Sequence, residues 1–446
     1  MSIKLSIKNV GMIDKANVEI GGLTVIAGKN NTGKSTIGKI LFSIITAIKS
    51  HRSILGENLN DKLAKHLEYI YNSITSITWD KNKSFVLYKE FNKFHPRIFY
   101  EDIEVNGFEM AFKQRIESLK IMQKVNMLNE VEFENLEHLL SGLPAVLSNE
   151  DKVENIFKKA IRKVWYSEFF SDIESKNLDL KKYPLEISML FDNVANISIY
   201  KNNGIEIKIS ENIKNIKDLA ILTPLKDATI IESPLVLNLS SSIFASDATF
   251  ERKEAVRASI LNIRGIVQLH IIDLMRKIQD SIYGDMLDNF DIYKIIDGYM
   301  KYDKEGNDFI YTANKNKRLK VVNTASGIRA FGILQMLLNS QILNKHYLLI
   351  LDEPEVHLHP EWQVKYAEIL IKMIKEYNNP MLVTTHSPYM LEALDKYSKK
   401  YNVDAKFYLA DKGIVQQVGK SNENTLEEVF KKLNEPFKIF DEMESE

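Results

Sequence analysis

The sequence has no cysteine among its 446 residues, which excludes disulfide bonds and cysteine-based metal sites. It has no strong charge bias either: 59 Lys and Arg residues nearly balance 60 Asp and Glu residues, for a net charge of −1. Overall charge therefore does not favour a nucleic-acid partner, although local basic patches remain compatible with one. No apolar run approaches the roughly 20 residues of a membrane helix, and the first residues lack the apolar stretch of a signal peptide. These absences predict a soluble, cytoplasmic, globular protein that does not contact membranes.

Turn signals are scarce over residues 51–183, where several segments combine helical spacing of apolar residues with many charges. We predict a mostly helical insertion there, with helices over residues 61–77, 108–125, 133–140 and 153–170 and a candidate strand over residues 84–89. Within it, residues 158–165 place four cations beside Trp165, a combination that could touch a phosphate backbone. A solvated face of an amphipathic helix explains the same residues, and we favour that interpretation.

Residues 28–35 read GKNNTGKS and fit the phosphate-loop pattern G-x-x-x-x-G-K-[ST] at every fixed position. A short apolar strand over residues 23–27 precedes the loop and a helix over residues 36–45 follows it, which is the context that the motif requires. In such a loop the glycines let backbone N–H groups point at phosphate oxygens, Lys34 reaches the terminal phosphates, and the Ser35 hydroxyl can ligate Mg²⁺. The residues predicted to bind nucleotide here are Gly28, Asn30, Asn31, Thr32, Gly33, Lys34, Ser35 and Thr36.

Two adjacent carboxylates end a second apolar strand. Residues 347–351 predict a fully buried strand, and Asp352 and Glu353 follow at its carboxyl end, where open α/β sheets bind ligands. Asp352 is placed to hold Mg²⁺, and Glu353 is placed to orient or deprotonate an attacking water. Packing alone does not explain two carboxylates at this point, because burying them costs free energy.

Three further features accompany these motifs. Ser326 and Gly327 open a predicted helix over residues 328–343, with Ser326 as its N-cap and N–H groups available to an anion. Residues 381–385 predict another buried strand, and His386 after it could hydrogen-bond a γ-phosphate. His357 and His359 lack a clear third ligand for a metal, so we interpret their segment as a structural loop.

The rest of the chain alternates between strands and helices. Period-two patterns predict strands over residues 3–8, 17–20, 186–191, 196–200, 205–209 and 229–231, and further short strands near residues 300–303, 309–311 and 319–322. A long helix is predicted over residues 250–279. After His386, a hairpin is predicted over residues 405–418 and a short helix over residues 425–433.

The order of phosphate loop, β-meander, helical arm, Ser-Gly helix start, Asp-Glu strand and Thr-His strand resembles the ABC-type ATPase heads of the SMC and OLD (overcoming lysogenisation defect) families. The likeness is greatest to stand-alone ATPase subunits of bacterial anti-phage operons, the PtuA subunits of Septu and the AriA subunits of PARIS among them. It covers about residues 1–50 and 185–400 and implies a Walker A motif at residues 28–35 and a signature motif at Ser326 and Gly327. It also implies Walker B at Asp352, catalytic Glu353, a D-loop over residues 355–360 and a switch histidine at His386.

The resemblance implies an α/β fold: an ABC-type ATPase head, or P-loop NTPase, with an antiparallel β-meander subdomain and a mostly helical insertion. The expected parts are the Walker A part of the head (1–50), the helical insertion (51–183), the β-meander (184–245), a helical arm (246–298) and the C-terminal part of the head (299–446). Two departures stand out. The signature carries one glycine where transporter heads usually carry two, and Glu232 is only a weak substitute for a Q-loop glutamine.

The expected function is that of an ATPase with ATP and Mg²⁺ as cofactors, dimerising through its ATP-bound heads and controlling a partner effector in anti-phage defence. Only 60 residues follow His386, too few for a Toprim nuclease domain, so we expect a nuclease to be a separate chain. The alternative is an SMC-like ATPase for DNA repair or tethering, with direct DNA contact left open. No heptad pattern persists for three or four repeats, which counts against that alternative. A transporter ATPase fits less well still, because residues 352–360 are SMC-like.

Overall fold

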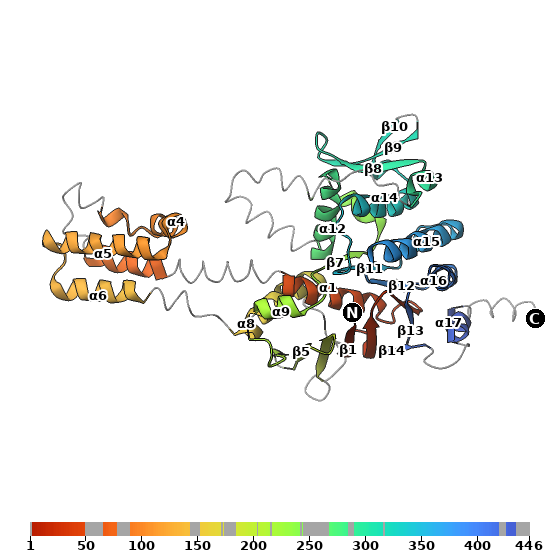
Figure 1. Ribbon diagram of the computed structural model, residues 1–446, viewed down its shortest axis with the longest axis horizontal. Coiled ribbons are helices and arrows are strands. Elements are labelled where there is room, and N and C mark those ends of the chain that lie inside the picture. Colours follow the sequence, from red (N-terminus) through yellow and green to blue (C-terminus); the bar gives the residue numbers. More distant parts are fainter. Residues whose placement is uncertain are drawn as a thin grey trace, which may run out of the picture. The chain divides into compact units, whose positions relative to one another are not determined.

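The computed structural model describes residues 2–49, 66–77, 90–142, 152–170, 173, 184–202, 204–214, 216–240, 243, 267–283, 290–314, 317–418 and 425–433. The chain forms two compact units (Figure 1). The first comprises residues 1–50 and 153–446, and the second comprises residues 51–152. None of the helices in the described ranges is long and apolar enough to span a bilayer.

An antiparallel meander makes up one half of the main sheet of the first unit. From the edge inward its strands are β6 (Ile205–Ile209), β5 (Ala195–Lys201), β4 (Leu185–Phe191), β1 (Ile3–Val10) and β2 (Ile13–Ile20). In β4 every second residue is buried, as expected where one face of a sheet packs on a core. The period-two patterns therefore predicted these strands correctly. The meander does not form a sheet of its own, because β2 continues into the other half of the main sheet.

The other half of the sheet is mainly parallel. Its strands continue in the order β14 (Ile414–Gln417), β13 (Ala405–Asp411), β3 (Leu23–Gly28), β12 (Met381–Thr385), β11 (Tyr347–Asp352) and β7 (Asp227–Ile231). Strands β13, β3, β12, β11 and β7 run parallel to one another. Their carboxyl ends therefore lie at the same edge, where open α/β sheets bind ligands. The phosphate loop follows β3 at this edge, and Asp352 ends β11 there.

Helices cover both faces of the parallel strands. Helix α1 (Lys34–Lys49) lies on one face, and Gly38 lets it approach closely, since a Cβ there would fall 2.9 Å from Ile350 Cγ2 on β11. The other face carries α14 (Ser326–Asn339), α15 (Pro360–Tyr377) and α16 (Pro388–Tyr401).

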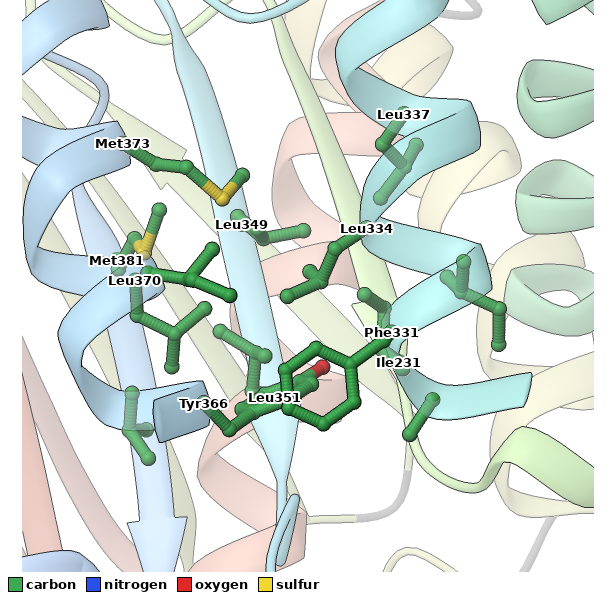
Figure 2. Packing of buried hydrophobic residues seen from close by; sticks show 14 of the residues in the cluster. Ile231, Phe331, Leu334, Leu337, Leu349, Leu351, Tyr366, Leu370, Met373 and Met381 are labelled. Carbon is green, nitrogen blue, oxygen red and sulfur yellow. The ribbon is translucent and has the colours of Figure 1, made fainter. Parts of the chain in front are cut away.

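The main hydrophobic core lies between β11 and the helices of this second face. Figure 2 shows Leu349 and Leu351 of β11 packed toward Phe331 and Leu334 of α14 and toward Tyr366 of α15. Tyr366 and Phe331 meet edge to face, with their ring centroids 5.1 Å apart. At about 1.5–3 kcal/mol per buried large apolar side chain, this core fixes the strand that carries Asp352.

The remaining elements of the first unit connect and flank these layers. They are α8 (Val153–Phe169), α9 (Ile216–Leu222), η1 (Pro234–Leu239), α12 (Leu269–Gln279), η3 (Asp280–Tyr283), α13 (Ile292–Ile296), β8 (Gly298–Asp303), β9 (Asp308–Ala313), β10 (Lys317–Lys320), η5 (Val321–Asn323) and α17 (Thr425–Leu433). Strands β8, β9 and β10 form a separate antiparallel sheet. The predicted hairpin at residues 405–418 and the helix at residues 425–433 are both confirmed.

The second unit is helical and has its own core. It contains a helix over residues 66–77 together with α4 (Pro96–Asn106), α5 (Phe108–Lys124) and α6 (Glu130–Ser141). Arg115 is buried in this core, where its guanidinium lies 4.2 Å from the centre of the Phe99 ring and donates to the Lys93 carbonyl. Burial lowers the pKa of Arg115 to about 10. Arg115 is therefore a buried polar group of this helical unit, as Glu90 and Ser118 also are.

Three expectations need correction or fall outside the described ranges. Helix α8 lies in the expected insertion of residues 51–183 but belongs to the first unit, because its buried face packs against α1 and β6. The charged residues 158–165 thus sit on an amphipathic helix whose Trp165 is buried. Of the long helix expected over residues 250–279, the structure has α12, and residues 250–266 lie outside the described ranges. The candidate strand over residues 84–89 lies outside them too.

Candidate active site

The phosphate loop wraps around the amino group of its own lysine. Lys34 is only 3% exposed, and its Nζ donates to the carbonyl oxygens of Gly28 (3.0 Å) and Lys29 (2.8 Å). Asn31 and Gly33 have positive φ angles of 62° and 85°, a region that asparagine and glycine tolerate. A Cβ at Gly33 would also come within 2.5 Å of a β2 side chain, so only glycine fits. This curled backbone is the conformation in which such loops turn N–H groups toward phosphate.

Asp352 joins the loop to the neighbouring strand β12. The Ser35 hydroxyl donates to Asp352 Oδ1 at 3.0 Å, and the Thr384 hydroxyl donates to the same oxygen. Asp352 is 8% exposed, and burial raises the pKa of its carboxyl, which the two hydroxyl hydrogen bonds oppose. The structure therefore brings Ser35 and Asp352 together as the sequence predicted. Thr384 is a partner that the sequence reasoning missed.

Glu353 lies between the phosphate-loop lysine and the histidine after β12. Its Oε1 is 3.4 Å from Lys34 Nζ, and its Oε2 is 3.4 Å from His386 Nδ1. The Glu353 backbone has a positive φ of 50°, held by N–H donation to Thr384 at 3.1 Å. These two neighbours hold the Glu353 carboxylate at the wall of the cavity that it shares with the phosphate loop.

Glu355 organises the turn that carries His386, and the sequence reasoning did not single it out. Its Oε1 accepts from the Thr385 hydroxyl (2.8 Å) and from the backbone N–H groups of His386 (2.8 Å) and Ser387 (3.2 Å). The same oxygen lies 3.2 Å from His386 Nδ1. Burial raises the pKa of Glu355, which is 4% exposed, although the backbone hydrogen bonds counteract the rise. A glutamate soon after an apolar strand that ends in two carboxylates is the signal that could have revealed it.

A cavity of about 400 Å³ opens at this edge of the sheet. Its walls are formed by Met12, residues 30–36, Glu232, Asp352, Glu353 and Val356. All the predicted loop residues from Asn30 to Thr36 therefore line one space with both predicted carboxylates. Gly28 lies at the base of the loop as the last residue of β3. Glu232, the weak candidate for the Q-loop position, also faces this cavity.

The predicted signature residues are not among those that line the cavity. Ser326 is the first residue of α14, and Ala325 occupies the N-cap position without a side-chain cap. The expectation that Ser326 caps the helix is therefore wrong, because the helical backbone starts at Ser326 itself. Gly327 packs against α15, where a Cβ would come within 2.9 Å of the Trp362 ring. The start of α14 is thus closely packed against α15 at Gly327, whereas Ser326 is only half-buried.

The oxygen atoms of the site fit a magnesium ion better than a zinc ion. Within the described ranges, no group of three or more His, Cys, Asp and Glu residues could hold a metal. Mg²⁺ needs no such cage, since it is commonly bound by one or two protein oxygens together with phosphates and water. Ser35 Oγ and Asp352 Oδ1 offer that arrangement. The segment with His357 and His359 is structural as predicted, with His359 as the N-cap of α15.

A phosphate loop between a parallel strand and a helix, with a carboxylate on a nearby strand hydrogen-bonded to the loop serine, defines a P-loop ATPase. The family model described as the AAA ATPase domain matches residues 1–391, so the chain belongs to this family. The expected α/β class is confirmed by the mixed sheet with helices on both faces.

Comparison with known proteins finds one curated relative and two solved structures to which the chain is similar. Endonuclease GajA of Bacillus cereus (strain HuB5-5) is 21% identical over 399 residues, which cover 83% of this chain and 52% of GajA. The chain thus spans about half the length of this curated relative. The SMC head domain from Thermotoga maritima aligns with a TM-score of 0.37 and 11% identity over 95% of this chain and 100% of that one. The Smc head domain of Pyrococcus furiosus, solved with an extended coiled coil and bound to the C-terminal domain of ScpA, aligns with a TM-score of 0.40 and 11% identity over 97% and 98%.

Proposed function

We propose that this protein hydrolyses ATP with Mg²⁺ in an ABC-type head-to-head dimer that controls a partner effector in anti-phage defence. The observation that supports it most is the convergence of Lys34, Ser35, Asp352, Glu353 and His386 at one edge of the parallel sheet. These side chains come from β3–α1, β11 and β12, and each has the chemistry that phosphoryl transfer to water requires.

In this mechanism the loop N–H groups of residues 30–35 cradle the phosphates. Lys34 exchanges its bonds to the Gly28 and Lys29 carbonyls for the β- and γ-phosphates. Ser35 and Asp352 would hold a Mg²⁺ ion, which would neutralise phosphate charge when bound. Glu353 accepts the proton of the attacking water, and His386 donates a hydrogen bond to the γ-phosphate.

The position of the signature residues supports the proposed dimer. Ser326 lies outside the walls of the cavity that the chain's own phosphate loop forms. We propose that Ser326 and Gly327 contact the nucleotide bound by a second copy, so that ATP closes the two heads on each other. Hydrolysis then opens the dimer and resets the partner effector.

The effector is proposed to be a nuclease. GajA is named an endonuclease, and this chain aligns with 52% of it. We propose that the aligned half is the ATP-hydrolysing half and that cutting is performed by a separate chain. The lack of a metal-binding cluster of acidic residues in the described ranges supports this division.

The test compares Glu353→Gln with Lys34→Ala. The glutamine cannot accept a proton, so ATP binding should persist in calorimetry while turnover slows by about 10²–10⁴-fold. The trapped ATP state should elute as a dimer on a sizing column. Lys34→Ala removes the charge that faces the phosphates and should abolish binding and dimerisation together.

Turnover of Glu353→Gln at the wild-type rate would assign the proton acceptor to another residue. ATP affinity unchanged in Lys34→Ala would contradict the site itself. An ATP-dependent dimer that retains DNA after a high-salt wash, with no effector required, would favour the SMC-like tethering alternative instead.

A further inference from the structure

A buried chain of carboxylate, imidazole and carboxylate leads to the wall of the active site. His270 Nδ1 lies 2.7 Å from Glu168 Oε2, and His270 Nε2 lies 3.1 Å from Glu232 Oε2. The backbone N–H of His270 also donates to Glu168 Oε1 at 2.9 Å. Glu168 lies on α8, His270 lies in the first turn of α12, and Glu232 directly follows β7. None of them has a role in the mechanism above.

Burying this series of hydrogen-bonded side chains costs free energy unless each of their polar atoms has a partner. The side chains of His270 and Glu168 are 1% and 0% exposed, whereas that of Glu232 is 35% exposed, toward the cavity. Because both imidazole nitrogens face carboxylates, both can donate only when the ring is charged. Burial alone would lower the pKa of His270, but the hydrogen bonds to Glu168 and Glu232 outweigh it and raise the pKa. The bond to His270 in turn lowers the pKa of Glu232 to about 2.

The result is a fixed negative charge at the cation end of the cavity. Glu232 Oε2 is held by His270, and Glu232 Oε1 lies 3.4 Å from Lys39 Nζ on α1, one turn after Ser35. Glu232, Asp352 and Glu353 line the same cavity as the phosphate loop. A divalent cation bound there would be attracted by all three carboxylates.

We propose that Glu168 and His270 are positioning residues that hold the Glu232 carboxylate toward the hydration shell of the divalent cation bound with the nucleotide. This inference rests on the proposed function of the same site. Glu232 then acts as a second carboxylate beside Asp352, contributed by the strand on the far side of β11. Outer-shell carboxylates of this kind commonly alter metal affinity by about 10–100-fold.

The test measures cation affinity without relying on turnover. Mn²⁺ binding to the protein with a non-hydrolysable ATP analogue is followed by electron paramagnetic resonance, and binding of the analogue in EDTA is followed by calorimetry. Glu232→Gln removes the charge at the cavity wall. The pair variant, Glu168→Gln combined with His270→Leu, removes the hydrogen bonds to Glu232 without leaving an unpaired buried charge.

Both variants should weaken Mn²⁺ binding by about 10-fold or more and leave analogue affinity in EDTA within about 3-fold. Combining all three changes should be no worse than Glu232→Gln alone, because the residues act through one group. Asp273→Asn is the matched control on α12, since Asp273 is held by Lys277 and Thr229 and is not among the residues that line the cavity. It should lower thermal stability without changing Mn²⁺ affinity.

If Glu168 and His270 only stabilise the fold, the pair variant should have a lower Tm and wild-type Mn²⁺ affinity. That result would overturn the inference. A change in Mn²⁺ affinity equal to that of Asp273→Asn would overturn it too. If the wild type binds neither the analogue nor Mn²⁺, the proposed function fails first, so the two failures are distinguishable. Should the pair variant not fold, Glu168→Gln alone still accepts from His270, and it should weaken Mn²⁺ binding in the same direction as Glu232→Gln but by a smaller factor. Wild-type Mn²⁺ affinity in Glu168→Gln would overturn the positioning role of Glu168.

Discussion

Glu355 shows how one buried side chain can hold the turn that carries His386. One of its oxygens accepts from a hydroxyl and two backbone N–H groups, while Oε2 is buried without a hydrogen-bond partner among the described residues. An ionised carboxylate in this position is costly, because burial disfavours the charged form. Its hydrogen bonds keep Thr385, His386 and Ser387 in register beside Glu353, so its cost in stability is tied to the geometry of His386.

We predict that Glu355→Gln folds and gains stability relative to the wild type as the pH rises. The amide oxygen can accept the same three hydrogen bonds, and the neutral side chain has no charge to bury. Since burial raises the pKa of Glu355, the folded wild type binds a proton more tightly than the unfolded chain does. Its stability therefore falls as the pH rises from the ordinary glutamate pKa through the raised one, and the variant's does not.

The measurement is Tm between pH 5 and pH 8 without nucleotide, with an expected advantage of about 2–4 °C at the upper end. Glu361→Gln, on the surface of α15, is the matched control. Lys365 lowers the pKa of Glu361 through their hydrogen bond, so any pH trend there should have the opposite sign. A flat difference across the range for Glu355→Gln would show that its carboxyl titrates normally.

At the scale of elements, α14 combines a face that is buried in the core with a start that is only half-buried. Its buried residues, Phe331 and Leu334 among them, pack on β11 and α15, while Ser326 at its start is only half-buried and makes no side-chain cap. A side chain cannot be added at Gly327, because Trp362 fills the space that it would occupy. The helix start can therefore accept a change at Ser326 without disturbing the core.

Ser326→Arg tests whether this helix start meets a second copy. We expect the chain to fold and to bind ATP as the wild type does, because the phosphate loop lies on β3 and α1. The bulky cation should block head-to-head closure, so dimerisation on a sizing column and ATP turnover should be lost together. Ser340→Arg, at the C-terminal end of the same helix, should leave both intact, since a cation there suits the helix dipole. A Ser326→Arg monomer with wild-type turnover would contradict the ABC-type dimer.

At the scale of the whole molecule, the chain separates into an ATPase unit and a helical unit with its own core. The helical unit packs residues such as Leu67, Phe94 and Leu119 into a separate cluster, so it does not depend on the main sheet for burial. Helix α8 is the first element of the ATPase unit after residue 152. It carries Glu168, which is linked to Glu232 through His270. The sequence on either side of the insertion thus builds parts of one site.

We predict that this protein alone leaves plasmid DNA and RNA intact with Mg²⁺ or Mn²⁺. Metal-dependent nucleases need several clustered carboxylates, and the pair Asp352 and Glu353 is occupied with ATP chemistry in our proposal. The acidic residues 441–446 lie outside the described ranges. Agarose and denaturing gels provide the readout, with cleavage expected only after a partner chain is added. Cutting by the protein alone that survives Glu353→Gln would reveal an active site elsewhere in the chain.

The sequence by itself determined those parts of this protein that depend on residues next to one another in the chain. The phosphate loop needs its glycines, Lys34 and Ser35 at fixed spacing, and the strand before Asp352 needs an unbroken apolar run, so both could be read directly. The meander strands were readable for the same reason, since burial of one face imposes a period of two.

Only the tertiary structure decided which distant residues complete the site. Thr384 meets Asp352 because β12 pairs in parallel with β11, and that pairing is set by the packing of α14, α15 and α16 on the sheet. His270 meets Glu168 across 102 residues of sequence, through the docking of α12 beside α8. Hydrogen bonds over such separations leave no local pattern, because they depend on how helices pack and not on the residues next to them.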